Sequence, residues 1–327
     1  MLKTLLKIIG LGFILIAILT AVPACSPPPP QEEAEQSDAY TEAESEAEEE
    51  ASGTQIEEGY QSPPGPANQV NILLLGLDER GLSDAIVLVS YNNETFDSAI
   101  ISLKRDTYVD FQTWSAEGMG HSAIGWASYV GTTYAEGDAL YGAAFSAYTI
   151  EQLLGIRIDH YAAITFEGFV EMIDQIGGVT VNLAPGFAET PLTPGWQRLS
   201  GEEALRYARH RKNPRIPEPG SISSDGDRIR RNQNLLKAVL EQCETLSTDE
   251  LLDVFDKLNQ KIYTNMDDWD LLILANIFFN HDLRLIDQVV LPGELEKVYE
   301  DKIDTELEYY FLDFEECDNI LTEVGVK

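Results

Sequence analysis

The chain has 327 residues, which allow one large domain with tails or two domains, and its 44% hydrophobic content is ample for a packed core. Its 56 acidic residues outnumber 22 basic ones and give a formal net charge of −34. This charge excludes the broad basic surface with which proteins neutralise nucleic-acid phosphates. Three cysteines are too few for a disulfide framework and no Cys/His cluster indicates zinc, while Cys243 and Cys317 could either pair or stay free.

The first 25 residues follow the pattern of a secretory signal. Lys3 and Lys7 precede an apolar run over residues 8–22, which leads into Ala21-Val-Pro-Ala-Cys25. A small residue before a cysteine resembles a lipoprotein cleavage site, with Cys25 as the lipidated residue. Two alternatives stay open: an uncleaved membrane anchor, since residues 5–24 reach the roughly 20 residues that span a bilayer, and plain secretion. The lipoprotein and the anchor both tether the domain outside the cell.

Residues 26–67 are predicted to be a disordered linker rich in proline and glutamate. Four consecutive prolines occupy 27–30, and residues 31–58 contain 12 acids and no base. Such a segment cannot bury enough apolar surface to fold, and charge repulsion extends it. We expect it to act as a spacer.

A folded domain is predicted over residues 68–293. Short apolar runs indicate buried strands at 70–77, 84–91, 98–103, 160–165, 179–183 and 285–291. Helices are expected at 139–154, 166–176, 201–209, 227–246, 248–260 and 267–280. Strands that alternate with helices indicate a layered α/β fold with a largely buried sheet. Residues 294–327 form an acidic C-terminal extension, whose aromatic residues are expected to pack as a terminal helix.

Basic residues gather in one short segment. Of the 22 bases, 10 lie between Arg198 and Lys237, within a strongly acidic chain. Arginine dominates there, and its planar fork fits the paired oxygens of phosphate or pyrophosphate. The segment is therefore predicted to be an anion site, with a solvated basic face as the alternative.

Two further stretches place charged residues at strand ends. Asp78 and Asp84 lie on either side of the turn between the first two strands, and Arg105 and Asp106 follow the third. Ligand groups gather beyond strand ends in open α/β sheets. Turn capping by the aspartates, and an ordinary ion pair between Arg105 and Asp106, are the alternatives.

These stretches resemble signatures of the LytR–CpsA–Psr (LCP) family. Residues 207–211 are similar to "YARxR", and 225–233 are similar to "DxxRxxRQ". Residues 75–84 resemble "LGxDxR…SD", 102–109 resemble "SxPRDxxV", and 166–181 resemble "FxGF…DxxGGVxV". Five motifs in the family's order, within a likeness that runs from about residue 68 to 293, make the resemblance strong.

The resemblance implies an α-β-α domain with a central mixed sheet and the activity of an extracytoplasmic phosphotransferase. It implies that a glycopolymer moves from a polyprenyl-pyrophosphate carrier to a hydroxyl of peptidoglycan, at the outer face of the cytoplasmic membrane. Asp78 and Asp84 would hold Mg²⁺ or another divalent cation. The residues implied to bind pyrophosphate are Arg80, Arg105, Arg209, Arg211, Arg228, Arg231 and Asn232. The implied catalytic residues are Arg105, Asp106 and Asp225, with Asp78 or Asp225 as the group that takes the hydroxyl proton.

Three positions depart from the family pattern. Leu82 stands where the family often has arginine, Lys104 replaces a proline, and Asn232 replaces a glutamine. These departures favour an alternative, a surface lipoprotein that binds polyprenyl phosphates without transferring them. A second alternative is a hydrolase that uses the same site and water as the acceptor. The glycopolymer and the acceptor stay open.

Overall fold

The computed structural model describes residues 59–109, 123–183, 192–210, 284–300 and 304–327, together with Ile56 and parts of 235–274. Its strands are β1 (Gln69–Leu77), β2 (Ser83–Asn92), β3 (Asp97–Leu103), β4 (His160–Thr165), β5 (Val179–Leu183), β6 (Gly195–Leu199), β7 (Ile262–Thr264), β8 (Arg284–Val290), β9 (Gly293–Glu300) and β10 (Thr305–Leu312). The helices whose bounds are described are the short 3-10 helix η3 (Ile124–Trp126), α2 (Ala127–Tyr134), α3 (Ala139–Leu154), α4 (Phe166–Gln175), α5 (Gly201–Arg209) and α9 (Phe314–Glu323).

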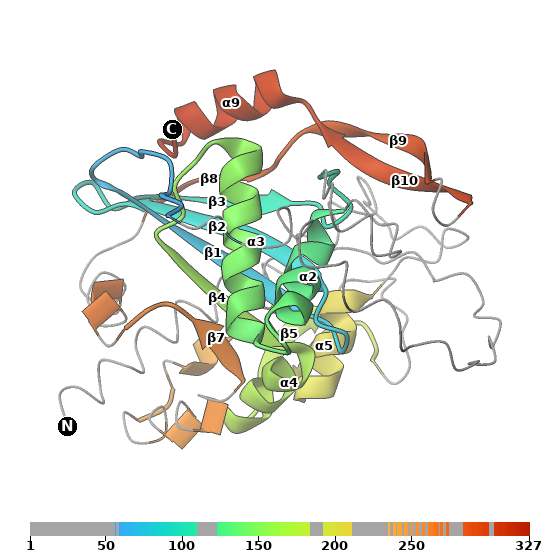
Figure 1. Cartoon of the computed structure of the whole chain (residues 1–327). Helices are drawn as coiled ribbons and strands as arrows, with labels where there is room; N and C mark the ends of the chain where they lie inside the picture. The colour runs from blue at the N-terminus through green and yellow to red at the C-terminus, as the bar shows by residue number, and fades with distance from the viewer. Residues whose placement is uncertain are drawn as a thin grey trace.

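The centre of the fold is a six-stranded sheet in the order β7-β4-β1-β2-β3-β8 (Figure 1). The pairs β1–β4 and β3–β8 are parallel, and the other neighbours are antiparallel. The strands predicted at 70–77, 84–91, 98–103 and 160–165 are all present. The predicted α/β class and its central mixed sheet are thereby confirmed.

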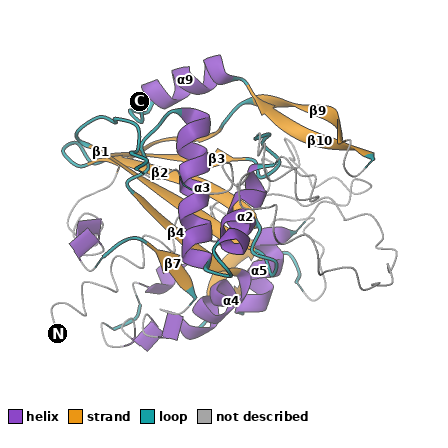
Figure 2. Ribbon diagram, in the orientation of Figure 1, coloured by secondary structure: helices purple, strands orange, loops and turns teal. Residues whose placement is uncertain are grey.

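Alternating side chains of the central strands build two hydrophobic cores, one on each face of the sheet. On one face, Ile72 and Leu74 of β1 pack with α4, α5 and buried residues between 235 and 274. On the other, Leu73 and Leu75 pack with α2, α3 and α9. Helices therefore cover both faces, as Figure 2 shows, and the apolar runs of β1 and β2 are continuous because each strand is buried on both sides.

The ends of the main helices follow from local side-chain chemistry. Asp138 caps α3 by accepting the backbone N–H of Leu140 at 2.9 Å, and Gly155 ends the helix in the left-handed conformation at φ 63°. Thr165 caps α4 by accepting the N–H of Gly168 at 3.0 Å. These residues set where α3 begins and ends and where α4 begins.

The C-terminal residues depart from the expected terminal helix. Strands β9 and β10 pair as an antiparallel hairpin, and only after β10 does α9 begin (Figure 1, red). Tyr309 and Tyr310 are buried strand residues of β10, and Cys317 and Leu321 of α9 belong to the core on the α3 face. The C-terminal residues thus complete the same core as the central sheet.

Part of the expected linker packs against α3. Glu151 is a buried carboxylate on α3, and its Oε2 accepts hydrogen bonds from the hydroxyls of Tyr60 at 3.0 Å and Ser62 at 3.1 Å. Ile56 donates its backbone N–H to the hydroxyl of Tyr141 at 3.1 Å. The chain is therefore attached to the domain before β1 begins.

Cys243 and Cys317 do not form a disulfide with each other. Cys243 lies against the core on the α4 face, whereas Cys317 is buried in the core on the α3 face, so the sheet separates them. Burial raises the pKa of the Cys317 thiol to about 11, which keeps it protonated at neutral pH. The disulfide between them, one of the two states left open by the sequence, is therefore not formed.

The described helices include none that is long and apolar enough to cross a bilayer. The N-terminal apolar run lies outside the described residues.

Candidate functional site

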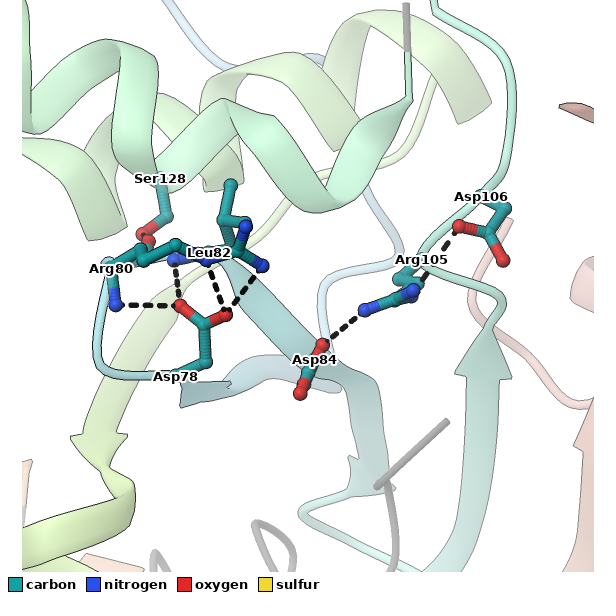
Figure 3. A network of polar contacts seen from close by, with 8 residues as sticks. Asp78, Arg80, Leu82, Asp84, Arg105, Asp106 and Ser128 are labelled. Carbon is teal, nitrogen blue, oxygen red and sulfur yellow. Dashed lines mark hydrogen bonds and ion pairs between the residues drawn. The ribbon is translucent and has the colours of Figure 1, made fainter. Parts of the chain in front are cut away.

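Asp78 organises the turn between β1 and β2. Its Oδ1 accepts the backbone N–H groups of Arg80 at 2.9 Å and Leu82 at 3.0 Å. Its Oδ2 accepts Nε and Nη2 of Arg80 at 3.2 and 3.0 Å (Figure 3). The carboxylate therefore engages four donors of its own turn, which is the turn role that the sequence left open.

The side chain of Leu82 points into the protein and is only 5% exposed. It cannot take the place of an anion-binding arginine. Arg80, whose side chain is 57% exposed, is the cation that this turn presents. In this structure its guanidinium contacts the Asp78 carboxylate, so pyrophosphate binding by Arg80 stays a prediction.

Asp84 and Arg105 meet at the same end of the sheet. Asp84 is the second residue of β2, and Arg105 follows the end of the adjacent strand β3. Nη1 of Arg105 lies 2.5 Å from Oδ1 of Asp84, and the two side chains are 13% and 3% exposed. The antiparallel pairing of β2 with β3 thus brings together two residues that are far apart in the sequence.

Asp106 is the third charged residue at this end. Its Oδ1 lies 3.3 Å from Nε of Arg105, and its side chain is 46% exposed. Arg105 is thus flanked by a buried carboxylate and an exposed one (Figure 3). This geometry supports the expectation that Asp106 orients a neighbouring arginine.

The start of α2 connects the two loops. Ser128 donates its hydroxyl to the carbonyl of Gly81 in the Asp78 turn at 2.6 Å (Figure 3). Gly125 of η3 donates its N–H to the carbonyl of Arg105 at 2.8 Å. A Cβ on Gly125 would lie 3.0 Å from the carbonyl oxygen of Ser83 and 3.1 Å from the Cβ of Arg105, so a glycine allows this close approach. Neither Gly125 nor Ser128 was predicted from the sequence to take part in this site.

Two buried hydroxyls lie beside the ion pair in the sequence. Ser83 Oγ and Thr107 Oγ1 have no hydrogen-bond partner within the described part of the chain. Ser83 precedes Asp84, and Thr107 follows Asp106. Because buried polar atoms are normally satisfied, this pattern favours a site that a polar ligand completes.

The predicted basic segment divides into different roles. Arg198 donates Nε and Nη2 to the carbonyl of Gly177 at 2.8 and 2.5 Å, so it fastens β6 to the turn after α4. Arg209, at the end of α5, places its guanidinium 4.5 Å from the centre of the Phe166 ring. Arg198, one of the ten bases, therefore stabilises the fold rather than forming part of an anion site.

The other predicted site residues lie outside the described residues. They are Cys25, Arg211, Asp225, Arg228, Arg231 and Asn232.

The residue types at the sheet end suit Mg²⁺, which takes oxygen ligands and needs only one or two carboxylates beside phosphate and water. However, both carboxylates already have partners within the protein. The four donors of its own turn surround the Asp78 carboxylate, and Arg105 holds Oδ1 of Asp84. No group of three or more metal-ligating side chains occurs among the described residues. Asp84 fits a metal once Arg105 shifts toward a phosphate, whereas Asp78 fits only if Arg80 also leaves.

Comparison with known proteins identifies relatives of this chain. The LytR_cpsA_psr family model matches residues 33–325, which include the β9–β10 hairpin and α9. A relative from Oceanobacillus iheyensis, named as a polyisoprenyl-teichoic acid–peptidoglycan teichoic acid transferase TagU, is 33% identical over 204 residues. The aligned stretch covers 61% of this chain and 59% of that relative.

Solved structures share the fold. A Listeria innocua protein superposes with a TM-score of 0.60 at 23% identity, covering 79% of this chain and 99% of that one. Bacillus subtilis TagV gives a TM-score of 0.56 at 25% identity, over 79% of this chain and 98% of that one.

Proposed function

Because the chain belongs to the LytR_cpsA_psr family, we propose that it transfers a glycopolymer from a polyprenyl-pyrophosphate carrier to a hydroxyl of peptidoglycan. The buried Arg105–Asp84 pair is the observation that carries this proposal most directly. The printed names of the relatives add the substrate class, since several are polyisoprenyl-teichoic acid–peptidoglycan transferases.

The reaction is a displacement at phosphorus. The acceptor oxygen forms a bond to the phosphorus that carries the glycan, and the bond from that phosphorus to polyprenyl phosphate breaks. Negative charge develops on the leaving phosphate, so the protein contributes mainly positioning and fixed positive charge. The hydroxyl proton leaves to a carboxylate of the site or to water.

Arg105 is the described residue best placed to bind the pyrophosphate. Its guanidinium is fixed by Asp84 and Asp106, and planar arginine donors suit paired phosphate oxygens. Arg80 at the rim and Arg209 at the end of α5 are further candidates. When bound, Mg²⁺ would neutralise phosphate charge, with Asp84 as its first protein ligand and Asp78 as a second if Arg80 releases it.

Asp78 is a poor candidate to take the hydroxyl proton, because its carboxylate engages four donors of its own turn. Asp225 keeps that role as a prediction. Asp106, which is half-exposed beside Arg105, is the described carboxylate that a substrate hydroxyl can reach most readily.

We place the domain at the outer face of the cytoplasmic membrane. The secretory pattern of residues 1–25 supports this location, and lipidation of Cys25 or an uncleaved apolar helix would tether it. The acidic residues between 31 and 58 would then separate the domain from an anionic membrane surface.

A transfer assay tests the proposal. The full chain in detergent is given a synthetic prenyl-pyrophosphate disaccharide, labelled on the sugar, together with peptidoglycan and Mg²⁺. We expect label to join the peptidoglycan and Arg105→Ala to abolish the transfer. Label released only as water-soluble sugar phosphate would instead show the hydrolase.

The non-catalytic lipid binder is the second candidate, because Leu82 and Lys104 depart from the family motifs. Binding of the labelled lipid without any turnover, with or without acceptor, would establish it. The structure offers an observation against it: Arg80 supplies a cation on the turn where Leu82 is buried.

A further inference from the structure

The segment that carries Arg105 lies between two elements from distant parts of the sequence. On one side, Ile124 and Gly125 donate their N–H groups to the carbonyls of Thr107 and Arg105, each at 2.8 Å. On the other side, Tyr310 of β10 donates its N–H to the carbonyl of Asp106 at 2.8 Å. Three successive carbonyls are therefore held alternately by η3 and by the C-terminal hairpin.

Tyr310 also contacts this segment at two further points. Its carbonyl accepts the N–H of Tyr108 at 2.9 Å, and its ring lies 3.8 Å below Nζ of Lys104. Its hydroxyl donates to the carbonyl of Leu291 at 3.3 Å, and the whole residue is only 6% exposed. Tyr310 thus holds the residues on both sides of Arg105 and is itself anchored at the end of β8.

A second aromatic contact strengthens the same junction. The Tyr108 ring stacks on Phe311 at 4.8 Å between centroids and meets Tyr309 edge-to-face at 5.6 Å. The hairpin therefore packs on the Arg105 segment through three consecutive residues of β10.

We propose that Tyr310 is a positioning residue for Arg105, and that the Lys104–Tyr310 contact sets where the guanidinium stands. This rests on the proposed function, in which Arg105 binds the donor pyrophosphate. A fork that makes two parallel hydrogen bonds tolerates a displacement of only about half an ångström. Because Lys104 is the residue before Arg105, releasing Lys104 from the ring lets the backbone at Arg105 move.

The experiment measures the affinity of the full chain in detergent for farnesyl pyrophosphate by calorimetry, with Mg²⁺ present. We expect Tyr310→Leu, which removes the ring, to weaken binding about three- to tenfold, the range of one partly desolvated cation–π contact. Tyr310→Phe keeps the ring and should bind within about twofold of the wild type. Tyr299→Leu is the matched control, because Tyr299 is a 54% exposed tyrosine of the same hairpin.

Lys104 supplies the reciprocal half of the test. Lys104→Met should weaken binding by a similar factor, and Lys104→Arg should restore it, since arginine also stacks on aromatic rings. The double variant Lys104→Met/Tyr310→Leu should be no weaker than the worse single variant, because both changes remove one contact. If Tyr310→Leu fails to fold, the Lys104 series carries the test alone.

Two outcomes overturn the proposal: farnesyl pyrophosphate affinity unchanged in folded Lys104→Met, or effects of the two single changes that simply add. Failure of the proposed transfer looks different, since binding would still respond to Lys104 and Tyr310 while no label reached peptidoglycan. Hydrogen exchange at the backbone amide of Tyr108 gives an independent readout. Faster exchange is expected in Tyr310→Leu and not in Tyr310→Phe.

Discussion

Arg105 donates a hydrogen bond through Nη1 to Oδ1 of Asp84 at 2.5 Å, at the end of the sheet where β2 begins and β3 has just ended. Both side chains are largely excluded from solvent, at 13% and 3% exposure. Each charge therefore depends on the other, because a buried charge that loses its partner keeps its full desolvation cost.

This dependence predicts a stability effect of substituting Asp84. Asp84→Ala leaves the Arg105 guanidinium buried beside a cavity and should lower the free energy of unfolding by about 3–5 kcal/mol. The double change Asp84→Ala/Arg105→Met should cost less than the two single changes together. Urea denaturation measures all three, with Arg80→Ala as control, since its exposed pair with Asp78 should contribute less than about 1 kcal/mol. Additive single effects would mean that the pair is not energetically coupled.

Three arginines of the basic segment should not all respond alike to substitution. Arg209→Ala should weaken pyrophosphate-lipid binding by roughly 1.5–3 kcal/mol, the size of a hydrogen bond to a charged group, and leave the melting temperature nearly intact. Arg228→Ala is expected to do the same. Arg198→Ala removes two bonds to the Gly177 carbonyl and should lower the melting temperature without changing affinity. An Arg209→Ala protein that binds normally, or simply unfolds, would assign that residue to the fold.

The central sheet could be predicted because its strands are buried on both faces. The run from Ile72 to Leu75 is continuously apolar, and such a run has few structural alternatives. The rule that ligand groups lie beyond strand ends also predicted the neighbourhood of Asp84 and Arg105. It did not predict their ion pair, because residue type and spacing do not report which partner a buried charge will find.

The β9–β10 hairpin was missed for a different reason. Seven acidic residues between 294 and 308 hide an alternating pattern, in which Leu295 and Tyr299 share one face of β9. The contact between Lys104 and Tyr310 joins two distant parts of the chain, and no local pattern encodes it. The same holds for Ser128, whose bond to Gly81 becomes visible only when α2 is placed.

The attachment of residues 56–62 to α3 predicts a pH effect at the alkaline end. Burial, and then the neighbouring Glu151 carboxylate, raise the pKa of Tyr60 from 10.0 to about 12. The protonated hydroxyl is the form that donates to Glu151, so its contribution to stability is complete below pH 10 and is lost as the pH rises toward 12.

Chemical denaturation of the wild type and of Tyr60→Phe at a series of pH values measures this contribution. The difference in the free energy of unfolding should be constant below pH 10 and shrink between pH 10 and 12. Other buried tyrosines titrate in both proteins and cancel in the difference. A difference that stays constant to pH 12 would mean that the hydroxyl is not held by Glu151.

The lipoprotein hypothesis predicts the outcome of one substitution. In cells fed labelled fatty acid, the wild type should carry the label and Cys25→Ala should not, with the precursor left uncleaved. Cys243→Ala is the control, because that thiol lies in the folded domain. If the wild type never takes up label and stays in the membrane, the apolar run is an uncleaved anchor instead.

The last prediction concerns how metal and lipid affect each other. In the free protein, Arg105 neutralises Asp84 and Arg80 neutralises Asp78, so neither carboxylate strongly needs a cation. A bound pyrophosphate competes for both arginines and leaves the carboxylates with unbalanced charge, which a divalent cation can offset. We therefore expect Mg²⁺ to bind weakly alone and more tightly with a pyrophosphate lipid present. By linkage, Mg²⁺ must raise lipid affinity by the same factor, expected to be about tenfold.

Calorimetric titration of farnesyl pyrophosphate into the wild type and Asp84→Asn, with Mg²⁺ or with EDTA, tests this coupling. The wild type should bind more weakly in EDTA, whereas Asp84→Asn should show nearly equal affinities in both buffers, because the amide cannot supply the charge that draws the metal. Asp84→Asn should still bind the lipid, since Arg105 then loses a competing carboxylate and stays available for phosphate. Equal wild-type affinities in the two buffers would show that Mg²⁺ binding is not coupled to lipid binding. Asp84 would then have the single role of holding Arg105.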